Sequence, residues 1–191
     1  MTDENSTAER AARRLALRQE MRRRRAALDA PTYQAHSAAI NAHLRLLPCP
    51  RIAAFCWPIE QEPDVRAAIE FWRAAGSRAA LPVVTAPATP LAFRAWTPAT
   101  PLAADRYGIP TPTAGAWLQP DLILLPLNAF DAAGYRLGYG GGFFDRTLAA
   151  LRPRPLAVGV GFEINRVADI EPEAHDQRLD WIVTEEGAWK V

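Results

Sequence analysis

Residues 136–146, with the sequence RLGYGGGFFDR, constrain the fold of this chain more than any other segment. Gly138, Gly140 and Gly142 alternate with single residues, and glycine adopts backbone angles that let main-chain N–H groups approach an anion. From residue 143 the apolar residues recur at helical spacing, so the loop is expected to end at a helix N-terminus, which favours negative charge. The pattern is neither the Walker motif nor GxGxxG. It indicates a phosphate-binding loop of another kind, or else a tight strand-to-helix connection.

The segment before this loop has the pattern of a strand buried on both faces. Residues 121–126, DLILLP, form a continuous apolar run that ends at a proline, which is typical of a central strand in a parallel sheet. The glycine loop therefore lies beyond the carboxyl end of that strand, where ligands bind in open α/β sheets. Arg136 is a planar cation suited to phosphate, and Asp145 could cap the following helix or hold a metal.

The order of the other elements predicts an α/β fold, because apolar runs typical of strands alternate with helix-like segments. We expect helices at about residues 7–29, 32–46, 63–76 and 143–151, and strands at about 51–57, 78–84, 91–96, 121–126, 155–162 and 180–185. The proline-rich stretch 98–120 is expected to be a long loop that folds over a site. We predict one domain over residues 1–191, with residues 1–8 disordered and a largely parallel sheet flanked by helices in three α/β/α layers.

Composition limits the class of protein. The chain has 191 residues, of which 49% are hydrophobic, and no apolar run long enough to span a bilayer, so it should form a substantial core and no membrane segment. A formal net charge of +1 gives no global attraction to nucleic acid or membranes. Because the polar N-terminus lacks a secretory signal, we expect a cytoplasmic protein with Cys49 and Cys56 as free thiols. No obligatory protein partner is predicted.

Arginine is concentrated near the N-terminus. Lys190 is the only lysine, and seven arginines lie within residues 13–25. Such a run is often a solvated helix face. Arg14 and Arg18, however, are four residues apart, so on a helix they project from the same face and could grip one polyphosphate together.

Residues 126–148, PLNAFDAAGYRLGYGGGFFDRTL, resemble the signature of the 5-formyltetrahydrofolate cyclo-ligases, also called methenyltetrahydrofolate synthetases. The resemblance extends over most of the chain, through Leu17-Arg18, a PxxxExD segment that ends at Asp64, an FRxW segment that ends at Trp96, and His175-Asp176. It implies an enzyme that uses ATP and Mg²⁺ to close 5-formyltetrahydrofolate into 5,10-methenyltetrahydrofolate, with release of ADP and phosphate.

The resemblance, together with the glycine loop, assigns roles to individual residues. The expected ATP-binding set is Arg14, Arg18, Arg136, Leu137, Gly138, Tyr139, Gly140, Gly141, Gly142, Phe143 and Phe144. Arg136 and Asp145 are the expected catalytic residues, and Asp145 and Asp176 the expected magnesium ligands. The expected folate-binding residues are Glu62, Trp96 and Phe144.

The scattered assignments have structural alternatives that the residues alone leave open. Glu62 and Asp64 flank Pro63, so they could be ordinary acids at a helix start. Trp96 lies in a strand and could belong to the core. His175-Asp176 could be a surface turn.

The sequence departs from the family pattern at three positions, and other functions fit parts of it. Arg14 stands where lysine is frequent, Gly141 where some members carry lysine, and Phe144 where tyrosine is common. The alternatives to a cyclo-ligase are a paralogue that uses ATP on another formamide or amino substrate, a non-catalytic nucleotide-binding protein, and an RNA-associated protein led by the arginine-rich helix.

Overall fold

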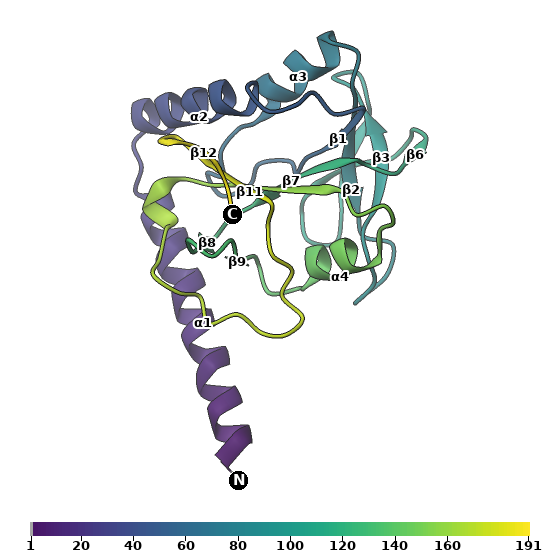
Figure 1. The fold of residues 1–191 in the computed structure, drawn as a ribbon. Helices are drawn as coiled ribbons and strands as arrows, with labels where there is room; N and C mark the ends of the chain where they lie inside the picture. The colour runs from purple at the N-terminus through teal and green to yellow at the C-terminus, as the bar shows by residue number, and fades with distance from the viewer. Residues whose placement is uncertain (1) are drawn as a thin grey trace.

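A mixed eight-stranded sheet forms the centre of the protein (Figure 1). The structure is a computed structural model that describes the backbone of residues 2–191 and the side chains from residue 8 onward. The strand order is β12-β11-β10-β7-β1-β2-β3-β6. Neighbouring strands are parallel from β11 to β2, and the other pairs are antiparallel. The parallel strands are β1 (Ile52–Ala54), β2 (Arg78–Val83), β7 (Leu122–Pro126), β10 (Leu156–Val160) and β11 (Trp181–Thr184). The antiparallel ones are β3 (Ala92–Trp96), β6 (Trp117–Leu118) and β12 (Gly187–Lys190). The predicted largely parallel sheet is confirmed.

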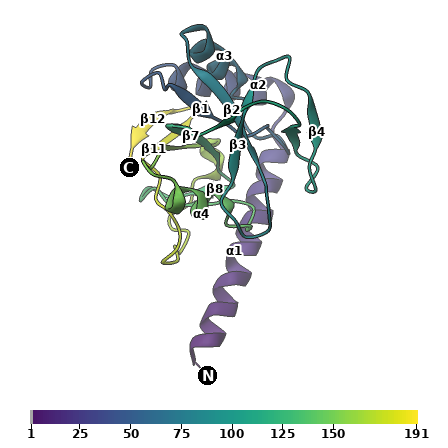
Figure 2. The ribbon, with the colours of Figure 1, turned by 90° about the vertical axis from the view of Figure 1, so that its right-hand side faces the viewer.

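Helices cover both faces of this sheet (Figure 2). Helices α2 (Ala30–Leu44) and α3 (Arg66–Ala74) lie on one face, and α4 (Phe143–Ala150) lies on the other. Alternate strand residues point to opposite faces, so Ala53 and Phe55 pack with Trp72 of α3, whereas Ala54 packs with Leu148 of α4. The three-layer prediction is therefore confirmed.

The proline-rich segment 98–120 is more ordered than the predicted loop. It contains an antiparallel hairpin of β4 (Leu102–Ala104) and β5 (Pro110–Pro112), followed by the edge strand β6. The Asp105 carboxylate closes the turn by accepting hydrogen bonds from the N–H groups of Tyr107 and Ile109, and Gly108 supplies the positive φ of 77°. A separate two-stranded ladder tolerates proline, because its outer side needs no N–H donors.

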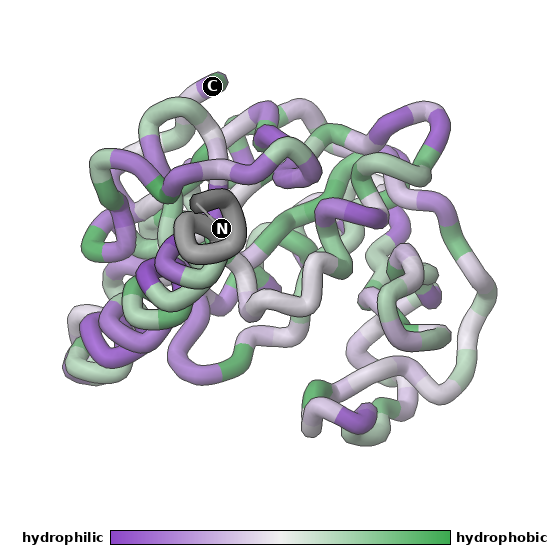
Figure 3. Tube along the Cα trace, turned by 90° about the horizontal axis from the view of Figure 1, so that it is seen from below, coloured by the Kyte–Doolittle hydropathy of each residue, from purple (hydrophilic) through white to green (hydrophobic). Residues whose placement is uncertain are grey.

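Helix α1 (Thr2–Ala26) begins earlier than the sequence suggested. Residues 2–8 are drawn into this helix and Met1 lies outside the described residues, while the disorder expected of residues 1–8 stays a prediction. Residues 2–26 contain no glycine or proline and many alanines, glutamates and arginines, all good helix formers. The N-terminal half extends away from the sheet (Figure 1), and hydrophilic residues follow much of the helix (Figure 3). Near its C-terminal end Met21 packs into a small core cluster.

Three short elements complete the chain. Strands β8 (Ala129–Phe130) and β9 (Arg136–Leu137) form a hairpin beside α1, and the short helix η1 is Glu163–Asn165. Over the described residues, no helix combines the length and the apolar character needed to cross a bilayer.

The α3 layer yields a test of the core. Trp72 is 0% exposed, so Trp72→Ala should lower the free energy of unfolding by about 3–5 kcal/mol through the lost burial and the cavity left behind. Phe71 precedes it on the same helix and is 47% exposed, so Phe71→Ala should lower it by less than about 1 kcal/mol. Urea unfolding followed by circular dichroism measures both; equal losses would contradict the placement of α3.

Candidate active site

A cavity of about 570 Å³ opens at the carboxyl ends of β1, β2 and β7. Helix α1 and the glycine loop form its walls together with the segment after β1 and residues 173–176. The volume falls within the range of small-molecule pockets, roughly 300–1,000 Å³. The cavity thus lies where the parallel sheet was expected to place a ligand.

The glycine loop leaves a run of main-chain donors free. Gly140 and Gly142 have φ values of 93° and 61°, a region that favours glycine. Gly142 is the N-cap residue just before α4, and the first N–H that bonds back along the chain is that of Arg146, to the Gly142 carbonyl. Among the described residues no acceptor bonds the N–H groups of residues 139–145. These N–H groups and the positive end of α4 suit an anion.

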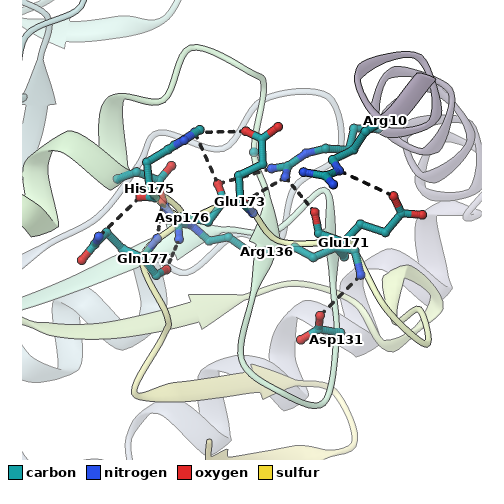
Figure 4. A network of polar contacts seen from close by, with 12 residues as sticks. Arg10, Asp131, Arg136, Glu171, Glu173, His175, Asp176 and Gln177 are labelled. Atoms are coloured by element: carbon teal, nitrogen blue, oxygen red, sulfur yellow. Dashed lines mark hydrogen bonds and ion pairs between the residues drawn. The ribbon is translucent and has the colours of Figure 1, made fainter. Parts of the chain in front are cut away.

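An ion pair between Arg136 and Asp145 closes the two ends of this loop, and Figure 4 shows Arg136 beside the segment that carries Asp176 and Gln177. The Arg136 guanidinium donates to Asp145 Oδ1 at 2.9 Å and to the Gln177 carbonyl at 2.7 Å. The Gln177 N–H donates to the same carboxylate oxygen at 2.9 Å. Arg136 and Asp145 are both largely buried, with side chains 4% and 18% exposed. The expected catalytic pair is therefore brought together, and it fixes the span of the loop.

The two arginines selected on α1 both reach the cavity. Arg18 donates to the Gly138 carbonyl at 2.9 Å and so holds the start of the glycine loop. Burial and the neighbouring charge of Arg14 lower the pKa of Arg18, opposed by Asp176. Arg14 donates two hydrogen bonds to the Asp176 carboxylate, at 2.9 and 3.3 Å, one to each oxygen. The same carboxylate also accepts a hydrogen bond from the Glu173 N–H at 2.8 Å.

The two expected magnesium ligands lie near each other but are both paired with arginine. Asp145 accepts from the N–H of Gln177, the residue after Asp176, so the two carboxylates border the same part of the cavity. Within the described part of the chain, no group of three or more His, Cys, Asp or Glu residues is arranged to hold a metal by itself. Two carboxylates still fit the preference of Mg²⁺ for one or two protein oxygens completed by phosphates and water.

Glu62 lies in the cavity wall and is 4% exposed. Its carboxylate accepts from the Tyr139 hydroxyl at 2.6 Å and from the Ile59 N–H at 3.1 Å. Burial raises the pKa of Glu62, although the bonds from Tyr139 and Ile59 and the charge of Arg25 oppose the rise. The helix-start interpretation does not apply to Glu62, because the acid that bonds the first N–H of α3, on Arg66, is Asp64.

Two residues predicted at the site lie outside the cavity. Trp96 pairs with Ala79 in the sheet and therefore faces the α2 and α3 layer, where its ring packs edge-on against Phe55 at 5.1 Å. Leu137 is 0% exposed and packs against Met21. Successive side chains of a strand point to opposite faces, and Trp96 in β3 and Leu137 in β9 both fall on positions that face the core. The remaining predicted residues, from α1, the glycine loop and the acidic positions, all line the cavity.

Other lining residues carried too weak a sequence signal to be selected. Trp57, which follows β1, is one of them. Tyr107, by contrast, belongs to the 98–120 stretch that was expected to fold over a site; it comes from the β4–β5 turn and packs edge-on against Phe143 at 6.1 Å. Arg25 is 1% exposed and bonds the Glu60 carbonyl at 2.8 Å, behind the cavity wall. Arg25 is the last of four consecutive arginines, and nothing in the local sequence shows which of the four is buried.

The arrangement is that expected of an α/β protein that binds an anionic ligand at the carboxyl edge of a parallel sheet. Comparison with known families narrows this class. The 5-formyltetrahydrofolate cyclo-ligase family matches residues 10–185, and this chain belongs to that family.

Curated relatives agree with this assignment. A 5-formyltetrahydrofolate cyclo-ligase of Mycolicibacterium smegmatis is 31% identical over 137 residues, 66% of this chain and 70% of that protein. One of Escherichia coli strain K12 is 34% identical over 137 residues, 68% of this chain and 75% of that protein.

Solved structures have the same fold. The 5,10-methenyltetrahydrofolate synthetase of Aquifex aeolicus superposes with a TM-score of 0.79 at 27% identity, over 93% of this chain and 92% of that one. The 5,10-methenyltetrahydrofolate synthetase of Mycoplasma pneumoniae superposes with a TM-score of 0.73 at 26% identity, over 90% of this chain and 98% of that one.

The Arg14–Asp176 pair yields a prediction with a defined pH dependence. The side chains are 11% and 6% exposed, so Arg14→Gln should lower the free energy of unfolding at neutral pH by about 1–3 kcal/mol. Burial favours a higher pKa for Asp176, but the bonds from Arg14 and the Glu173 N–H lower it overall. The stabilisation is therefore complete above the ordinary carboxyl pKa of about 4 and is lost as the pH falls through the lowered value.

Urea unfolding at a series of pH values tests this. The difference between wild type and Arg14→Gln should shrink in acid. Arg13→Gln is the control, because Arg13 pairs with Glu171 on the exposed surface, where ion pairs contribute little and are screened by salt. A similar loss from both variants, independent of pH, would contradict the prediction.

Proposed function

We propose that this chain uses ATP to cyclise 5-formyltetrahydrofolate to 5,10-methenyltetrahydrofolate, with release of ADP and phosphate. The observation that carries the proposal is the glycine loop, whose free N–H groups lie between Arg136 and Asp145 in the same cavity as Glu62. An anion-binding side and a buried carboxylate that can accept N–H donors from a pterin-type ring suit the two substrates. Membership of the cyclo-ligase family supports the same reaction.

The chemistry explains why the site needs no protein nucleophile. A formamide oxygen is a poor leaving group, so it first attacks the γ-phosphorus of ATP, the bond from that phosphorus to the ADP oxygen breaks, and the oxygen becomes a phosphate ester. N10 then adds to the formyl carbon and loses its proton, and the C–O bond breaks to release phosphate. Positioning and charge stabilisation are the tasks left to the protein. Cys56 lines the cavity, but burial raises the pKa of its thiol well above its usual range, which disfavours the thiolate.

The phosphate side of the cavity supplies cations and N–H donors to the transferring group. Arg136, Arg14, Arg18 and the N–H groups of residues 139–145 would stabilise the charge on the phosphates. Asp145 and Asp176 would hold magnesium, which when bound neutralises phosphate charge. Both carboxylates are paired with arginines here, so they become ligands when the phosphates draw those arginines away.

The folate side is formed by Glu62 and by the aromatic side chain of Phe144, which lines the cavity without a hydroxyl. Glu62 would accept hydrogen bonds from the N–H groups of the pterin, and Phe144 would offer a ring face. A cytoplasmic location and the lack of an obligatory protein partner stay predictions.

A direct assay tests the function. Purified protein is mixed with 5-formyltetrahydrofolate, Mg²⁺ and ATP, and the absorbance of the methenyl product is followed. A rise that requires ATP is expected. If ATP binds but no product forms, the paralogue or the non-catalytic nucleotide-binding protein becomes the better explanation.

Asp145→Asn tests the phosphate side. The substitution removes a magnesium ligand and weakens the Arg136 pair, so turnover should fall about a hundredfold or more and half-maximal activity should need more Mg²⁺. Asp169→Asn removes the same charge from an exposed position and should change neither value. Unchanged activity in Asp145→Asn would remove this residue from the site.

A further inference from the structure

The hydroxyl of Tyr139 joins the two sides of the cavity. Tyr139 lies between Gly138 and Gly140 in the glycine loop, and its hydroxyl donates to Glu62 Oε1 at 2.6 Å. Arg25 donates to the same hydroxyl at 3.4 Å from behind. The residue is nevertheless 44% exposed, so its position does not depend on core packing. Two polar contacts therefore hold the hydroxyl at the cavity wall.

The loop that carries Glu62 is held in a conformation that needs support. Glu60 and Gln61 have φ values of 48° and 56°, in the left-handed region that non-glycine residues rarely adopt. Arg25 donates to the Glu60 carbonyl at 2.8 Å, and the Tyr33 hydroxyl donates to the Glu62 carbonyl at 3.0 Å. The backbone is thus fixed by α1 and α2, whereas the end of the carboxylate is oriented by the Tyr139 hydroxyl and the Ile59 N–H.

This orientation leaves room for a ligand on the same carboxylate. An ionised carboxylate can accept about four hydrogen bonds, and two are used here. Burial and the nearby charge of Glu62 raise the pKa of Tyr139 far above its usual range, so the hydroxyl stays a donor at working pH. The remaining lone pairs of Glu62 are free for N–H donors of a substrate.

We propose that Tyr139 is a positioning residue that couples the two substrate sites: a nucleotide on the glycine loop fixes Tyr139, which holds Glu62 in the orientation that binds the folate. The inference rests on the proposed function, since it takes Glu62 as a folate contact. The contact that would transmit the preference is the hydrogen bond from Tyr139 to the Glu62 carboxylate, and hydrogen bonds to a charged group are stronger than neutral ones. Linkage makes the effect reciprocal, and bound folate strengthens nucleotide binding by the same factor.

Binding measurements test the coupling. Isothermal titration gives the Kd of 5-formyltetrahydrofolate with and without the non-hydrolysable analogue AMP-PNP and Mg²⁺. In the wild type the analogue should lower this Kd about tenfold. In Tyr139→Phe, which keeps the ring, the ratio should fall to less than about twofold. Tyr135→Phe is the matched control, because the Tyr135 hydroxyl bonds no described residue and Tyr135 lies outside the cavity.

Two further readouts separate positioning from a structural role. If Tyr139 acts through Glu62, the double variant Glu62→Gln/Tyr139→Phe should bind folate no more weakly than Glu62→Gln alone. Folate binding should also decline in acid as Glu62 is protonated, and Tyr139→Phe should move that decline to higher pH because a bond that lowers the pKa of Glu62 is lost.

The pH readout must be assigned to Glu62 among its charged and titratable neighbours. The groups of this kind are Arg25 of α1, Tyr33 of α2, Cys56 after β1, Glu60 of the same loop and Tyr139 itself. All of them except Tyr139 are unchanged in Tyr139→Phe, and the Tyr135→Phe control should titrate like the wild type.

The outcomes are distinct. Loss of the ratio in Tyr139→Phe, with a thermal midpoint close to that of the wild type, supports the coupling. A wild-type ratio near one, or a ratio unchanged in Tyr139→Phe, overturns it even if the enzyme turns over. If the wild type forms no methenyl product from 5-formyltetrahydrofolate, the proposed function itself fails.

Discussion

The ion pair between Arg136 and Asp145 is the contact on which the site depends. It joins the first residue of β9 to the first turn of α4, and through Gln177 it also fixes the segment that carries Asp176. The residues between the two partners are therefore closed into a loop of fixed span. Breaking a pair with side chains this buried would leave a charge without a partner, so the loop and the C-terminal segment are held together.

Helix α1 completes the cavity from outside the sheet. Its C-terminal half packs through Met21, and from there Arg18, Arg14 and Arg25 reach the glycine loop, Asp176 and the Glu60 carbonyl. Each of these arginines thus bonds a different segment of the cavity wall. The arginine-rich run has the sequence pattern of a solvated helix face, but the arginines on one side of the helix bond and support the cavity wall.

Much of the fold and part of the site could be predicted from local pattern. The apolar run DLILLP predicted a buried strand, because a strand covered on both faces needs apolar side chains throughout. The glycine run predicted the turn and the start of the next helix, because only glycine readily adopts the backbone angles found there. Trp96 and Leu137 were misplaced because the face of a strand depends on register, which a short motif does not reveal. The Tyr139–Glu62 contact joins residues 77 positions apart, and only the folded chain shows it.

Two arginines of the cavity are paired with carboxylates in this structure. Arg14 is held by Asp176 and Arg136 by Asp145. A phosphate offers the arginines oxygen acceptors of the same geometry as a carboxylate, so it competes directly for them. The carboxylates released by this exchange would be left partly buried and unpaired, which is unfavourable unless a cation arrives with the phosphate. On the proposed function, these two pairs would therefore favour binding of the nucleotide as its metal complex over binding of the free anion.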